Sequence, residues 1–146
     1  MTFGKGTSDM DHRGFRTSGQ LKFFAGLLPL ALLFMVGGVL HFCFPETYLR
    51  IMPPFLPRPG ILIAVSGAAE ILGGLGLLIA RFRRAAAYCL AFLLVAVFPA
   101  NVYMAATHVP FPGFMGESWV QWLRLPLQIP LILWALHYRH RTTGEI

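Results

Sequence analysis

One acidic side chain, Glu70, lies in the middle of an apolar stretch that runs from Gly60 to Ala80. A carboxylate at that depth in a membrane is costly, so we expect it to have a partner or a function. Arg124 lies in another apolar stretch and is the cation that we expect to pair with it. Three outcomes stay open: an ion pair that only fixes the register of two helices, a ligand, quinone or proton site, and no contact.

Further polar side chains lie within the apolar stretches, at or beyond the depth of Glu70 on one side of the membrane. Arg124 and Gln128 are four residues apart and share a helix face. Pro99 deprives the Val95 carbonyl of its helical donor, and a nearby amide is expected to replace that donor. We therefore predict one polar pocket with six candidate ligand-binding residues, namely His41, Glu70, Asn101, Tyr103, Arg124 and Gln128.

Other kinds of chemistry lack their usual sequence patterns. The histidines have no metal-ligand spacing within a stretch, so no metal site is predicted. Cys43 and Cys89 are expected at opposite membrane faces, too far apart for a disulfide. We find no dinucleotide or phosphate-binding loop and no serine elbow, and no catalytic residue is assigned.

The composition predicts the membrane-spanning helices that hold these residues. The chain has 146 residues, of which 56% are hydrophobic and only 12% are charged, whereas soluble domains have about 25% charged residues. Blocks of about 20 apolar residues can each cross a bilayer. We predict an all-α integral membrane four-helix bundle over 21–138, with cytoplasmic tails at 1–20, expected to be disordered, and 139–146. Its four spans are 21–44, 60–80, 85–107 and 119–138.

The charge distribution predicts the orientation of the bundle. The net charge is +6, and basic residues gather at Lys22, at 81–84 and at 139–141, next to the ends of apolar blocks. That placement is typical of cytoplasmic anchors and argues against nucleic-acid binding. Both termini are then cytoplasmic, and the proline-rich loops 45–59 and 108–118 cover an outward-facing pocket. Aromatic residues near the ends of the fourth span are expected to form an interfacial belt, namely Trp119, Trp122, Trp134 and Tyr138, with Trp122 also able to line the pocket.

Three segments resemble the DoxX-like family of small bacterial membrane proteins. They are SGAAEILGG at 66–74, FPANVYMA at 98–105 and WLRLPLQ at 122–128. HF at 41–42 and YLRIMP at 48–53 also fit, and the similarity covers about Phe24 to Tyr138.

The resemblance implies a multi-pass protein of the bacterial inner membrane. The family takes its name from a subunit of a thiosulfate:quinone oxidoreductase, other members are linked to redox homeostasis, and distant relatives act in membrane-protein assembly. It therefore implies a redox- or quinone-associated subunit, with membrane lipids, a quinone and a redox protein as partners. Whether the chain is enzymatic stays open, with a subunit of a quinone-linked oxidoreductase as one alternative. The alternatives are a carrier of small molecules or lipids and a non-catalytic structural or assembly subunit.

Overall fold

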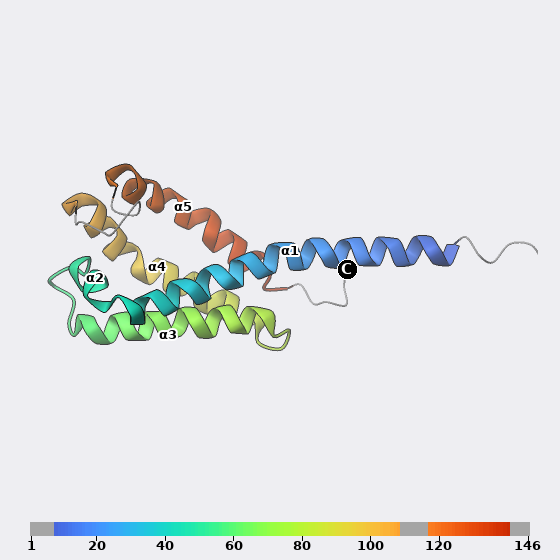
Figure 1. Ribbon diagram of the computed structural model, residues 1–146, viewed down its shortest axis with the longest axis horizontal. Coiled ribbons are helices and arrows are strands. Elements are labelled where there is room, and N and C mark those ends of the chain that lie inside the picture. Colours follow the sequence, from blue (N-terminus) through green and yellow to red (C-terminus); the bar gives the residue numbers. More distant parts are fainter. Residues whose placement is uncertain (1–7, 109–116, 141–146) are drawn as a thin grey trace, which may run out of the picture.

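The computed structural model describes residues 8–108 and 117–140, with side chains from Gln20 onward, and this part of the chain is helical without strands. The expectation of an all-α fold is confirmed, and the ends of the apolar blocks fall close to the observed helix ends except at the start of the first block. The loop predicted at 108–118 lies almost wholly outside the described residues. The five helices (Figure 1) are α1 Ser8–Cys43, α2 Pro45–Arg50, α3 Pro59–Leu78, α4 Arg83–Thr107 and α5 Ser118–His137.

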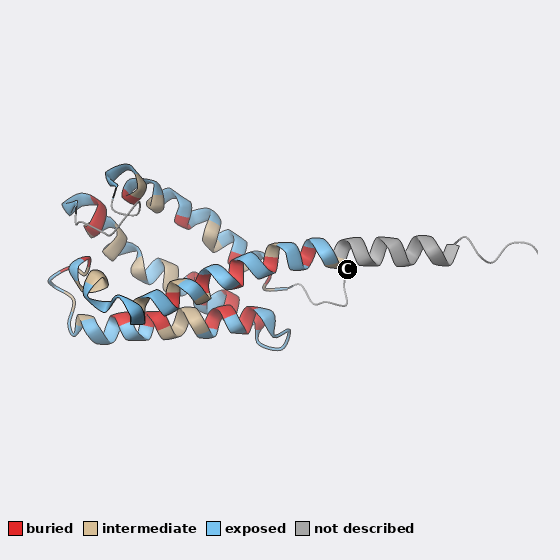
Figure 2. Ribbon diagram, in the orientation of Figure 1, coloured by how far each residue is buried: buried red, intermediate tan, exposed pale blue. Residues whose placement is uncertain are grey.

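Three helical segments are long and apolar enough to cross a membrane, namely Gln20–Cys43 of α1, α3 and α4. Only 22–39% of the most apolar part of each is buried inside the protein. Large apolar side chains such as Leu72 and Phe92 are about 70% exposed (68% and 74%), and Figure 2 shows exposed residues along the outer faces of the helices. Soluble monomers rarely expose apolar patches of this size, so this surface indicates a membrane protein.

The N-terminal segment differs from the expected tail. α1 begins at Ser8 and not at Leu21, and its first part extends beyond the other helices (Figure 1). Residues 8–20 contain no proline, so nothing in this segment forces the helix to end.

The helices pack in the order α1, α3, α4, α5, with α2 turned back over α1 and α3. Figure 1 shows α4 and α5 diverging from α1 and α3 toward the end that carries α2. We call this end the His41 end and the opposite one the Phe23 end, after two residues of α1. At the Phe23 end α5 meets α1, where the Tyr138 hydroxyl donates to the Phe23 carbonyl oxygen at 3.5 Å.

The apolar core lies at the Phe23 end. It is built from large side chains such as Leu27, Leu77 and Leu90, which are fully buried, and from small alanines. Tyr138 belongs to this core and is only 5% exposed, so its assignment to an interfacial belt was wrong. Its ring lies edge-on to Phe23 with centroids 5.3 Å apart, and the core therefore includes the last turn of α5.

Arg83 is buried although it lies in the basic turn that was expected to be a surface anchor. Its Nε donates to the Leu77 carbonyl oxygen at 2.8 Å, and a terminal nitrogen lies 3.5 Å from the Leu78 carbonyl oxygen. Its guanidinium also lies over the Phe23 ring, 5.0 Å from the centroid. Arg83 thus satisfies carbonyls that the end of α3 leaves without helical donors.

Glycines let α1 and α3 approach closely, as small residues do between membrane helices. A Cβ atom on Gly38 would lie 2.5 Å from the Gly67 carbonyl oxygen, and one on Gly67 would lie 2.8 Å from the His41 Cβ. One on Gly74 would lie 2.7 Å from the Ala31 carbonyl oxygen. We call this contact the glycine seam (Gly37, Gly38, Gly67 and Gly74).

Replacing Gly38 with alanine is expected to destabilise the protein by about 1–3 kcal/mol, because the new methyl group meets backbone that cannot move aside. Gly60→Ala is the matched control, since a Cβ at Gly60 meets nothing within 4 Å. That change should stabilise α3 by about 0.5–1 kcal/mol through helix propensity. The measurement is unfolding by sodium dodecyl sulfate in mixed micelles, and equal effects of the two changes would contradict the seam.

Candidate functional site

His41 and Glu70 meet across the glycine seam. The His41 Nε2 lies 3.7 Å from a Glu70 carboxylate oxygen, and the two side chains are 12% and 16% exposed. Side chains lean toward the N-terminus of their own helix, and α1 and α3 run antiparallel here, so these two lean toward each other. The carboxylate rests against Gly37, where a Cβ atom would lie 2.8 Å from Oε2. We call His41 and Glu70 the dyad.

The contacts of His41 favour a protonated state of the dyad. The His41 Nδ1 lies 3.2 Å from the Ile63 carbonyl oxygen, which can only accept, so Nδ1 carries a hydrogen. The other ring nitrogen then faces the carboxylate. A bare nitrogen and an ionised carboxylate would repel each other, so the pair is stable when it holds one more proton, either on His41 or on Glu70. The dyad is therefore suited to accept and release a proton.

Tyr48 of α2 covers the dyad. Its ring stacks on the His41 ring with centroids 3.9 Å apart and an interplanar angle of 31°. Burial and the Glu70 carboxylate raise the pKa of the Tyr48 hydroxyl, and the Arg124 guanidinium opposes this shift. The hydroxyl consequently stays protonated over the physiological range and remains a hydrogen-bond donor.

A second polar contact joins α4 and α5. The Asn101 Nδ2 donates to the Gln128 Oε1 at 3.2 Å, and the Gln128 Nε2 donates to the Leu94 carbonyl oxygen. An amide was predicted to serve a carbonyl released by Pro99, and the carbonyl observed is one residue before Val95. We call Asn101 and Gln128 the amide pair.

Arg124 is related to the amide pair by its position in α5 and to Tyr48 by its charge. It lies one turn before Gln128 on the same helix, and its charge acts on Tyr48. The contact that the structure gives Glu70 is with His41, whereas a direct contact between Glu70 and Arg124 stays a prediction. Four of the six candidate residues therefore meet in two pairs, and a fifth is linked to the dyad through Tyr48.

The structure gives other surroundings for Tyr103, Trp122 and His108. Tyr103 is half-buried in α4, and its backbone carbonyl accepts a hydrogen bond from Thr107 at 2.7 Å. Trp122 is 51% exposed. His108 faces Ser118 with Nδ1 2.8 Å from its hydroxyl oxygen, which ties the end of α4 to the start of α5.

Tyr48 was not among the predicted site residues. It follows the proline that ends α1, and the short helix α2 brings it back over the last turn of α1. An aromatic residue two turns after a histidine, beyond a helix-ending proline, is the signal that could have identified it.

The next features are the possible metal ligands and the cysteines of the described residues. These residues contain no group of three or more histidine, cysteine or acidic side chains that could hold a metal ion. Cys43 and Cys89 are free and exposed.

Comparison with known proteins gives one match. Residues 30–139 match the family model described as "Domain of unknown function (DUF8561)". The chain belongs to this family. The DUF8561 region contains the dyad, Tyr48, Arg124 and the amide pair, and it ends at the residue that follows Tyr138. Comparisons with curated proteins and with solved structures gave no match.

A double-mutant cycle should detect the contact within the dyad. His41→Phe keeps a ring against Tyr48 and removes both nitrogens, while Glu70→Gln removes the carboxylate charge. Their effects on the free energy of unfolding should be non-additive by about 0.5–3 kcal/mol, as for residues in direct contact. The control cycle pairs His41→Phe with Glu46→Gln, because Glu46 is exposed in the neighbouring α2. Additive effects in both cycles would contradict the contact.

Proposed function

We propose that this protein is a quinone-binding subunit of the bacterial inner membrane that works with a redox partner protein. The dyad carries the proposal, because a largely buried pair that holds one proton can donate a hydrogen bond to a quinone carbonyl. The resemblance to the DoxX-like family supports the same class of ligand.

Neighbouring groups suit such a ligand. The protonated Tyr48 hydroxyl and the Arg124 guanidinium are donors, and quinone oxygens only accept. The Ser66 hydroxyl lies one turn before Glu70 on α3 and is buried without a hydrogen-bond partner among the described residues. A polar group left unpaired in this position favours a ligand that approaches the dyad from α3.

In this proposal α5 is the fourth span, and both termini are cytoplasmic. α5 has 20 residues, enough for about 30 Å of hydrocarbon, and Leu127, Ile129 and Leu133 are more than half exposed, as in contact with lipid. The Phe23 end carries most of the described basic residues and is placed in the cytoplasm by the positive-inside rule. The dyad and Tyr48 then face the outer leaflet, from which a quinone can enter.

A structural role is the second candidate, because the dyad lies within the glycine seam and could serve only to fix the register of α1 and α3. Under this role Glu70→Gln changes stability and nothing else.

A binding titration separates these two functions. The purified full chain in nanodiscs is titrated with a short-chain ubiquinone, and binding is followed by quenching of tryptophan fluorescence. We expect saturable binding that Glu70→Gln weakens at least tenfold, because without the carboxylate the dyad no longer holds the extra proton that it shares with His41. Glu46→Gln is the matched control and should bind as the wild type does.

Two results would contradict the quinone proposal. One is the absence of saturable binding by the wild type, together with no quinone in organic extracts of the purified protein. The other is unchanged binding by Glu70→Gln. Thermal midpoints of both variants are measured alongside, so that a loss of folding is not counted as a loss of binding.

A further inference from the structure

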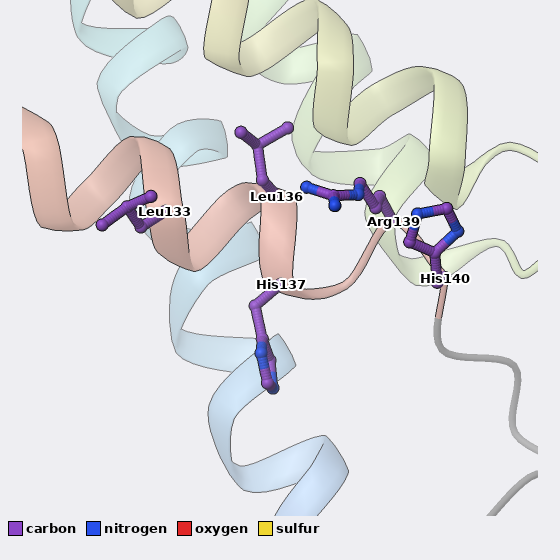
Figure 3. A pocket seen from close by; sticks show the side chains of 5 residues that line it. All are labelled: Leu133, Leu136, His137, Arg139 and His140. Atoms are coloured by element: carbon purple, nitrogen blue, oxygen red, sulfur yellow. The ribbon is translucent and has the colours of Figure 1, made fainter.

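An open recess of about 320 Å³ lies at the Phe23 end of α5, away from the dyad. It is lined by Leu133, Leu136, His137, Arg139 and His140, and Figure 3 shows these side chains around the point where α5 ends and the chain turns away. Its volume is at the lower limit of small-molecule sites, which is about 300 Å³. None of these residues belongs to the site proposed for the quinone.

Arg139 supplies an unsatisfied positive group in this recess. Its Nε is buried and has no hydrogen-bond partner among the described residues, whereas its backbone N–H is used at the helix end and donates to the Leu136 carbonyl oxygen at 3.2 Å. A buried guanidinium nitrogen without an acceptor is unfavourable. Because this nitrogen has almost no accessible surface, an anionic oxygen in the recess would bind the terminal nitrogens and offset the charge of the whole guanidinium. Guanidinium groups bind phosphate oxygens with suitable geometry.

The surroundings of the recess favour an anion. Arg83 and Lys22 flank Phe23, which packs on Tyr138, the residue before Arg139. The acidic residues whose side chains are described, Glu46, Glu70 and Glu117, belong to the dyad or to the His41 end. Nothing acidic among the described side chains therefore competes for Arg139.

The recess also has an apolar side. Leu133 and Leu136 are three residues apart and lie on one face of α5 with His137. Leu133 is 63% exposed, and the apolar surface continues from it along α5 toward Ile129. A site with cations at the end of a membrane-length helix and exposed leucines beside them matches a phospholipid, with its phosphate at the end and its acyl chain along the helix.

We propose that this recess binds the phosphate headgroup of an anionic phospholipid, with Arg139 as the principal contact and His140 as a second donor. In the orientation proposed above the recess faces the cytoplasmic leaflet. The binding itself does not depend on the quinone proposal.

Native mass spectrometry of the full chain in detergent tests this site. The protein is mixed with phosphatidylglycerol or with phosphatidylcholine carrying the same acyl chains. We expect the wild type to prefer phosphatidylglycerol at least tenfold, and Arg139→Gln to reduce its binding at least fivefold. The matched control is Arg58→Gln, which removes the same charge from an exposed position at the His41 end and should keep the preference.

Two further variants and a competition with inorganic phosphate complete the test. Arg139→Lys keeps the charge and should retain part of the preference, whereas His140→Gln should weaken binding without unfolding the protein and replaces Arg139→Gln if that variant does not fold. Millimolar inorganic phosphate should not displace the lipid. Equal binding of the two lipids, equal losses in Arg139→Gln and Arg58→Gln, or full displacement by free phosphate would each overturn the proposal.

Discussion

The close contact between α1 and α3 determines how this protein places its polar groups. Where Gly37 and Gly38 face Glu70 and Gly67, the two backbones come near enough for His41 to reach both the Ile63 carbonyl and the Glu70 carboxylate. Any larger side chain in this contact would separate the helices and leave a carboxylate facing hydrocarbon, at a cost of several kcal/mol. The seam and the dyad are therefore coupled, because the glycines make room for the carboxylate and for its contact with His41.

The two ends of the protein differ in the side chains that they contain. The Phe23 end is packed with leucine, alanine and phenylalanine, and Arg83 closes the end of α3 with hydrogen bonds to its last carbonyls. The His41 end is opened by the divergence of α4 and α5 (Figure 1) and holds Tyr48, Arg124 and the dyad.

Much of this architecture could be predicted from the sequence, because length and hydrophobicity alone set the ends of membrane helices. Spacing also put Arg124 and Gln128 on one helix face. Pro99 predicted a free carbonyl at Val95, whereas the Gln128 amide donates to the carbonyl of Leu94. Contacts between helices were harder to predict, because the sequence does not show which helix faces pack against each other. The charges of Glu70 and Arg124 suggested a direct pair, which stays a prediction. The contact with His41 was not expected, because it depends on α3 packing against α1. Tyr48 was not predicted as a site residue and Arg83 was not predicted to be buried. The sequence of a proline-rich loop or a basic turn does not show which side chain points into the protein.

The Glu70 carboxylate lies against the His41 imidazole inside the protein and not in lipid. Solid-state NMR of the full chain in bilayers, with ¹³C-labelled glutamate and ¹⁵N-labelled histidine, tests it most directly. The account predicts a dipolar contact between the Glu70 carboxyl carbon and the His41 Nε2, at a separation set by the 3.7 Å contact to the carboxylate oxygen, which disappears in Glu70→Gln and persists in Glu46→Gln. A Glu70 carboxyl signal that correlates with lipid acyl chains and not with His41 would contradict it.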